Sequence, residues 1–77
     1  MDNSQFMEDL AAILEVDPGE LHAEFVLHNG NWNSLAIVSA IVLLDEHFGI
    51  VIPGEKLRFC TSIGELWELI QSIQRDA

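Results

Sequence analysis

The sequence predicts an all-α fold: an antiparallel four-helix bundle with three main helices and one short helix, in a single domain over residues 1–77. In three separate segments, apolar residues recur every three or four positions, which is the spacing of an amphipathic helix. Hydrophobic residues make up 49% of the chain and aromatic residues 8%, a composition typical of helices rich in Leu, Ile and Val. A chain of 77 residues has room for one core and not for a second.

The first helix is expected to begin at Asp2, Asn3 or Ser4, because these residue types cap helix N-termini. Its apolar stripe is expected to comprise Phe6, Leu10, Ile13 and Leu14. Asp17-Pro18-Gly19 should break this helix and turn the chain.

A long connection should precede the second helix. A short turn is expected over residues 20–24, with Leu21 and Phe25 packing inward. Residues 27–33 are dense in Asn and Gly, so we expect them to form a loop.

The second helix should begin at Asn33-Ser34 and run to about His47 or Phe48. Gly49 stands where a C′ glycine usually ends a helix in the left-handed conformation. At about 100° per residue, one side of this helix gathers the residues expected to face the core, namely Ile37, Ala40, Ile41, Leu44 and Phe48. An extended apolar link over residues 50–54 should follow.

Two further helices are expected after this link. A short helical turn should lie around Glu55 to Phe59, and the last helix should begin at Thr61 or Ser62. Ser62 and Glu65 have the spacing of a capping box. The buried stripe of the last helix is expected to comprise Ile63, Leu66, Trp67, Ile70 and Ile73.

A second face of the helix that begins near Ser34 also carries apolar residues. Its members are Ser34, Leu35, Val38, Ser39, Val42, Asp45 and Glu46. A surface helix normally keeps a single apolar stripe, so two explanations arise. Either the helix is central and packed on several sides, or Leu35, Val38 and Val42, rimmed by Asp45 and Glu46, form a docking face. Such a face would suit partners with a basic rim around a hydrophobic spot.

The charge of the chain is strongly negative. Thirteen acidic residues against three basic ones give a net charge of −10, which disfavours nucleic acid and anionic membrane surfaces as partners and favours basic proteins. The longest apolar stretch, around residues 37–44, is too short to span a bilayer. One cysteine cannot form an internal disulfide, and residues 1–4 lack the pattern of a signal peptide. We therefore expect a cytoplasmic monomer.

An enzyme is not expected. The three histidines lack metal-ligand spacing with Cys60, so no metal site is predicted. Cys60 is expected to be a small core residue, since no histidine is placed in the sequence to activate it. Asp45 and Glu46 are adjacent rather than convergent, which does not suit a general acid–base pair.

Three blocks of sequence are similar to those of the acyl carrier protein family. Trp32-Asn33-Ser34-Leu35 resembles its Asp-Ser-Leu signature, often preceded by Trp, at the start of the second helix. Residues 45–53, Asp-Glu-His-Phe-Gly-Ile-Val-Ile-Pro, resemble its acidic-acidic-x-Phe-Gly-Ile-x-Ile-Pro block. Residues 61–66 resemble the threonine-rich start of its last helix. In this order the blocks cover nearly the whole chain.

The resemblance implies a carrier protein that holds acyl intermediates as thioesters on a 4′-phosphopantetheine arm, for fatty-acid, polyketide or related biosynthesis. Ser34 would be the attachment residue, with Asn33 and Leu35 beside it. A phosphopantetheinyl transferase would supply the covalent arm from coenzyme A, and enzymes that load, elongate or transfer the acyl group would dock through basic surfaces. By spacing alone, Ser34 also fits a plain N-cap serine.

The chain departs from the family pattern beside the proposed attachment residue. Asn33 replaces the usual Asp, and Asn29 and Asn31 are amides at loop positions where acids are common. The early part of the docking face is also less acidic than is typical, with Ala36 and Ser39. Two alternatives therefore stay open: an aminoacyl or D-alanyl carrier with the same arm, and an unmodified interaction module that kept the fold. Asn33 favours the second.

Overall fold

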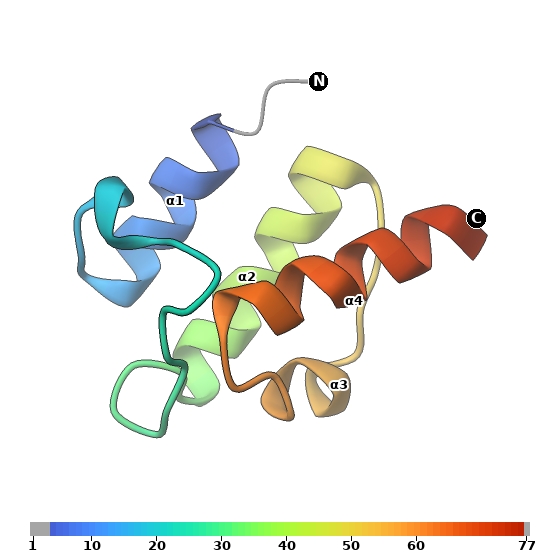
Figure 1. Cartoon of the computed structure of the whole chain (residues 1–77). Coiled ribbons are helices and arrows are strands. Elements are labelled where there is room, and N and C mark those ends of the chain that lie inside the picture. Colours follow the sequence, from blue (N-terminus) through green and yellow to red (C-terminus); the bar gives the residue numbers. More distant parts are fainter. Residues whose placement is uncertain (1–3, 77) are drawn as a thin grey trace.

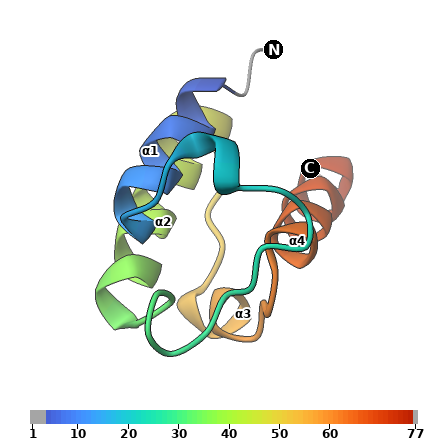
Figure 2. The ribbon, with the colours of Figure 1, turned by 60° about the vertical axis from the view of Figure 1, so that its left-hand side comes forward.

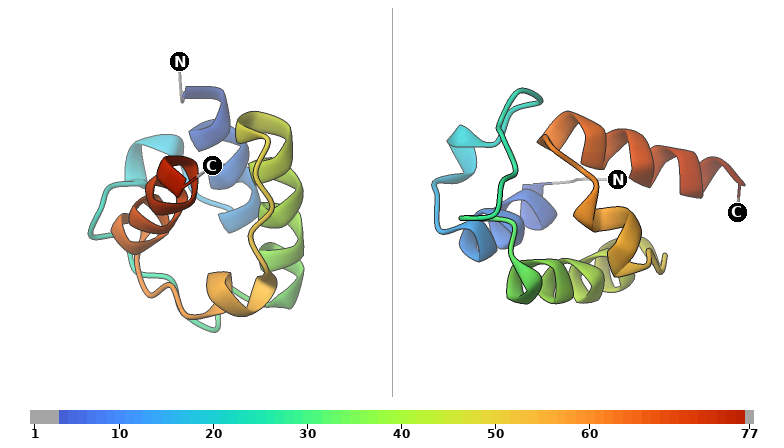
Figure 3. Two further views of the ribbon diagram at one scale, coloured as in Figure 1. Left: turned by 90° about the vertical axis from the view of Figure 1, so that its right-hand side faces the viewer. Right: turned by 90° about the horizontal axis from the view of Figure 1, so that it is seen from below.

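The computed structural model describes residues 4–76 as a helical bundle. Its elements are α1 (Ser4–Leu14), the 3₁₀ helix η1 (Pro18–Glu20), α2 (Ser34–Phe48), α3 (Gly54–Arg58) and α4 (Ile63–Asp76). α1 and α2 lie side by side and antiparallel (Figure 1). α4 lies on the opposite side of the bundle from α2, and α3 lies at the end where α2 begins (Figures 2 and 3). The predicted all-α fold, with three main helices and one short helix, is confirmed.

One apolar core joins α1, α2, α3 and α4. The largest fully buried side chains are Phe6, Leu10, Leu44, Ile52, Leu57, Ile63, Leu66 and Ile70. The expected stripes of α1 and α4 face this core, with Ile13, Trp67 and Ile73 partly buried at its edge.

Aromatic contacts join α1, α2 and α4 at one end of the core. The ring of Phe6 lies edge-on to the rings of His47, Phe48 and Trp67, at centroid distances of 5.6, 5.0 and 5.7 Å. Beside them, His47 Nε2 lies 3.0 Å from Asp9 Oδ2. This pair links α2 to α1 where the two helices pack together.

The end of α1 differs from the expectation. The helix ends at Leu14, before Asp17-Pro18-Gly19, because Glu15 adopts a left-handed backbone with φ of 60°. Glu15 N–H donates to the Ala12 carbonyl and Val16 N–H to the Ala11 carbonyl, the two bonds of a Schellman motif. The proposed caps Asp2 and Asn3 lie outside the described residues. Only the chain conformation, and no glycine or proline in the sequence, marks this helix end.

The connection between α1 and α2 is attached to the start of α4. The short turn expected over residues 20–24 begins earlier, as the 3₁₀ helix Pro18–Glu20, and a second turn joins His22 to Phe25. Val26 and Ser62 then form an antiparallel bridge. Gly64 N–H donates to the Ala23 carbonyl, and a Cβ at Gly64 would lie 3.0 Å from that oxygen. A side chain at Gly64 would therefore push this connection away.

The start of α4 is capped, although not by the complete box that was expected. Ser62 Oγ accepts from Glu65 N–H at 3.2 Å, as predicted. The Glu65 carboxylate, however, accepts from the Thr61 N–H and from the Thr61 hydroxyl, both at 2.7 Å, one residue further back. These bonds, the Thr61 N–H first, lower the pKa of Glu65 because they stabilise the charged form.

The lowered pKa of Glu65 predicts a specific loss of stability in acid. A carboxyl group whose pKa is lower in the folded state contributes stability above its ordinary value of about 4.3. That contribution is lost as the pH falls through the lower folded-state value. The difference in thermal unfolding between wild type and Glu65→Gln should therefore be larger at pH 7 than at pH 3. Glu68→Gln removes a charge from the same helix and controls for net charge. An equal difference at both pH values would contradict the prediction.

Candidate functional site

The start of α2 is capped by Asn33 and not by Ser34. Asn33 Oδ1 accepts from Ala36 N–H at 2.9 Å, and the Asn33 carbonyl accepts from Ile37 N–H at 2.9 Å. Asn33 has the extended backbone of an N-cap, with φ of −89° and ψ of −179°. The interpretation of Ser34 as a plain N-cap is therefore wrong, and an amide does the capping as well as an acid would.

Ser34 occupies the first position inside α2 and is exposed. Its hydroxyl makes no hydrogen bond to residues 4–76. In the same part of the chain, the N–H groups of Ser34 and Leu35 also have no partner, as is usual for the first turn of a helix. The structure thus holds a hydroxyl at a helix N-terminus, where unpaired N–H groups and the helix dipole favour a negatively charged group.

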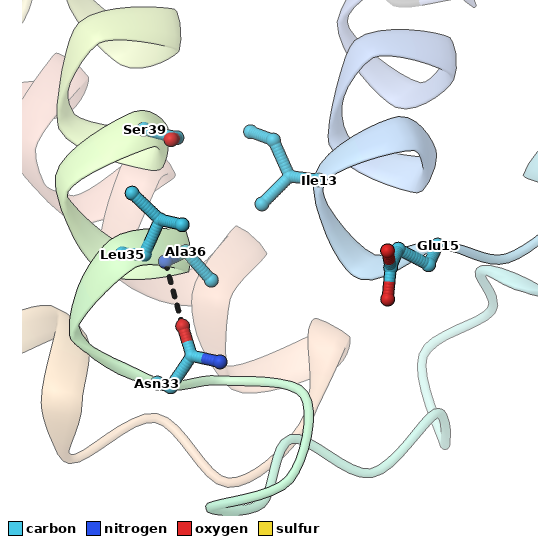
Figure 4. A pocket seen from close by; sticks show the side chains of 6 residues that line it. All are labelled: Ile13, Glu15, Asn33, Leu35, Ala36 and Ser39. Atoms are coloured by element: carbon cyan, nitrogen blue, oxygen red, sulfur yellow. Dashed lines mark hydrogen bonds between the residues drawn. The ribbon is translucent and has the colours of Figure 1, made fainter.

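An open hollow of about 250 Å³ lies beside this serine, between the end of α1 and the start of α2 (Figure 4). Its lining residues are Ile13, Glu15, Asn33, Leu35, Ala36 and Ser39. The Asn33 amide nitrogen points toward the α1 side, where Glu15 lies (Figure 4). An asparagine therefore caps α2 without adding a second carboxylate to a hollow that already holds Glu15. Ser34 does not line the hollow, although both its neighbours do.

The outer face of α2 is apolar and exposed to solvent. Leu35, Val38 and Val42 are 77%, 58% and 51% exposed, and Asp45 and Glu46 beside them are also exposed. Packing on several sides therefore does not explain the second apolar stripe of this helix. We keep the name outer face for these five residues. Their role in docking stays a prediction.

Two residues near Ser34 differ from their sequence interpretation in an informative way. Ala36, which we placed in the early docking face, is buried toward α1. Asn31, where acids are common in the family, uses both ends of its amide: Oδ1 accepts from His28 N–H at 2.9 Å, and Nδ2 donates to the Val26 carbonyl at 3.1 Å. An aspartate could not donate the second bond. The amide at Asn31 therefore has a structural reason.

Trp32 fixes the loop before α2 to α3. Its ring is buried, and its indole N–H donates to the Leu57 carbonyl at 2.7 Å. Because Leu57 is in the last turn of α3, this bond holds that turn against the Trp32 ring, and Trp32 is two residues before Ser34.

Cys60 is buried, as predicted. Burial raises the pKa of its thiol, and the negative charge of Glu65 raises it further. The thiol is therefore protonated at neutral pH and is a poor nucleophile.

Sequence reasoning missed four exposed residues on or beside α3. Val51 and Phe59 are 72% and 79% exposed. Arg58, with Lys56, supplies two of the three basic residues of the chain from one five-residue helix. That concentration of positive charge is visible in the sequence and could have been noticed there.

Comparison with known proteins agrees with these observations. The chain is 37% identical over 70 residues to an acyl carrier protein of Helicobacter acinonychis (strain Sheeba), with 83% of this chain and 88% of that protein covered. The chain belongs to the acyl carrier protein family. No family model matches it, and no solved structure matches it. Membership of the acyl carrier protein family supports a carrier role.

Two negative findings apply to residues 4–76. No helix there has both the length and the hydropathy needed to cross a membrane. Within the same residues, the structure brings together no three His, Cys, Asp or Glu side chains that could hold a metal ion.

Proposed function

We propose that the protein carries acyl groups as thioesters on a 4′-phosphopantetheine arm attached to Ser34 Oγ, for fatty-acid, polyketide or related biosynthesis. The observation that carries this proposal is the division of roles at the start of α2. Asn33 caps the helix, and the exposed Ser34 hydroxyl is left free. Membership of the acyl carrier protein family supports the carrier role.

The residues around Ser34 fit the arm. In the attachment reaction, Ser34 Oγ forms a bond to the phosphorus that carries pantetheine in coenzyme A, the P–O–P bond breaks, and 3′,5′-ADP leaves as the serine proton is lost. The new phosphodiester keeps one negative charge, which the unpaired N–H groups of Ser34 and Leu35 and the dipole of α2 would stabilise. The bound arm supplies a terminal thiol that holds the acyl group.

The outer face suits the partners this function needs. Leu35, Val38 and Val42 lie within about two and a half turns of Ser34, and Asp45 and Glu46 lie at the far end of the same face. A phosphopantetheinyl transferase, and enzymes that load, elongate or transfer the acyl group, would contact this surface with an apolar spot and a basic rim. The charges would mainly speed their encounter with the carrier.

The direct test is the intact mass of the protein after incubation with coenzyme A, magnesium and a broad-specificity phosphopantetheinyl transferase. We expect the gain of one phosphopantetheine, located at Ser34 by fragmentation of the modified peptide. No gain, in wild type and in Asn33→Asp alike, would contradict the proposal and favour an unmodified interaction module. If the arm attaches, loading assays with fatty acyl and amino acid substrates separate the acyl carrier from the aminoacyl or D-alanyl alternative.

Asn33→Asp should speed attachment of the arm by up to about fivefold, the worth of one exposed charge contact of about 1 kcal/mol. Aspartate still caps α2, and it adds a negative charge beside Ser34 where the transferase and its magnesium ion approach. Initial rates of mass gain measure the effect, which should shrink as salt is added. Asn29→Asp, the same change in an exposed loop, is the control. Equal rates in wild type and Asn33→Asp would show that the transferase does not sense this charge.

A further inference from the structure

The positive charge of this very acidic protein is concentrated on α3. Lys56 and Arg58 lie in its last turn, and Arg75 is the only other basic residue against thirteen acids. Both side chains are exposed, and neither forms an ion pair within residues 4–76. Cations at a helix C-terminus interact favourably with the helix dipole, but that role does not distinguish Arg58 from Lys56.

Packing shows which side of α3 faces α2. A Cβ at Gly54 would lie 3.6 Å from Ile37 Cγ2 and 3.7 Å from Ile41 Cδ1, so the Gly54 side of α3 contacts α2. Residues four apart lie on the same side of a helix. Arg58 therefore shares the α2-facing side with Gly54, whereas Lys56, two residues from each, points elsewhere.

The first residue of α3 lies beside the middle of α2, and the last turn of α3 is bonded to the loop that precedes α2. Gly54 lies at the level of Ile37 and Ile41. At the other end, Leu57 accepts a hydrogen bond from the Trp32 indole, two residues before Ser34. Arg58 follows Leu57, so the spacing argument puts it on the α2-facing side of α3, toward the loop that leads into α2.

Ser34 lies where the outer face of α2 meets the side of α2 that faces α3. Ser34, Ile37 and Ile41 are three and four residues apart, which places them along one side of the helix, and that side faces α3. Ser34 also does not line the hollow on the α1 side. We therefore expect the Ser34 hydroxyl and the Arg58 side chain to lie near each other, at the end of the α2–α3 contact that is closer to the start of α2.

We propose that Arg58 binds the phosphodiester that joins the arm to Ser34. This inference rests on the proposed function and assigns a binding residue to it. A guanidinium presents paired N–H donors that match phosphate oxygens and stays charged at all relevant pH values. In a chain with net charge −10, Arg58 offsets the repulsion that a further negative group meets, and it holds the base of the arm on the α3 side of α2.

The test compares unmodified and arm-bearing forms of wild type, Arg58→Gln and Lys56→Gln, each modified to completion as shown by mass. Attachment of the arm should raise the melting temperature of wild type by roughly 1 to 5 °C more than it raises that of Arg58→Gln. This is the range for one exposed ion pair in a domain of this size. Lys56→Gln should keep the wild-type gain. The ³¹P resonance of the phosphodiester should shift in Arg58→Gln and not in Lys56→Gln, and about 0.5 M salt should reduce both differences.

Arg58→Lys retains a charge without the paired donors and should show an intermediate ³¹P shift. If Arg58→Gln and Lys56→Gln alter the modified and unmodified forms equally, the two bases act only on the α3 dipole, and this inference fails while the proposed function stands. If wild type never accepts the arm, both fail.

Discussion

Replacing Ser34 with alanine should abolish attachment of the arm completely and leave the fold intact. The attachment reaction needs a hydroxyl oxygen, and alanine has none. The helix itself does not depend on that oxygen, because Asn33 supplies the cap through its bond to Ala36 N–H. Alanine is the best helix former, and substitution at an exposed position typically changes stability by less than about 0.5 kcal/mol.

Intact mass after incubation with the transferase, together with circular dichroism and thermal unfolding, measures the effect of Ser34→Ala. Ser72→Ala removes an exposed hydroxyl from α4 and should gain the arm as wild type does. A mass gain that persists in Ser34→Ala would move the attachment residue elsewhere. A large loss of helical signal would show that Ser34 has a structural role that the capping geometry does not reveal.

Val38→Glu should lower kcat/KM for the transferase by roughly 10- to 100-fold. Val38 lies between Leu35 and Val42 on the outer face of α2, so a partner that docks there would cover it. Burying an unpaired carboxylate at the centre of such a contact costs on the order of 2 kcal/mol or more, and each 1.4 kcal/mol is tenfold. Val38 is 58% exposed, and we expect thermal stability to change little.

Val26→Glu is the matched control for Val38→Glu. Val26 is also 58% exposed, and it lies on the connection that bridges to Ser62 and not on α2. Both variants add the same charge, so both carry the same general repulsion or attraction toward a partner. Equal losses of kcat/KM would trace the effect to net charge, and no loss in Val38→Glu would remove Val38 from the transferase contact.

Most of the fold could be predicted because its signals are local. The 3.6-residue period of apolar side chains placed α1, α2 and α4, and Gly49, with φ of 65°, ends α2 as its sequence position indicated. The end of α1 could not be predicted in the same way. Glu15 takes a left-handed conformation that is unfavourable for a residue with a Cβ, so its residue type does not signal the end of a helix.

The candidate site was predicted in part. The motif around Ser34 and the apolar residues of the outer face were identified from the sequence. The exposure of the outer face could not be predicted, because two apolar stripes on one helix fit either a central helix or a docking helix. The partition of roles between Asn33 and Ser34 also depended on backbone conformation: either residue type can cap a helix, and only the observed geometry shows which one does.

The sequence by itself determined the helical class, the family and the position of Ser34 at the start of α2, since these follow from residue type and from neighbours within one or two helical turns. The tertiary structure alone decided which face of α2 is exposed and how α3 packs against α2 and the loop before it. Arg58 is twenty-four residues away from Ser34 in the chain, and no local pattern connects them. The packing of Gly54 against Ile37 and Ile41, and the bond from Trp32 to Leu57, bring them to one end of the bundle.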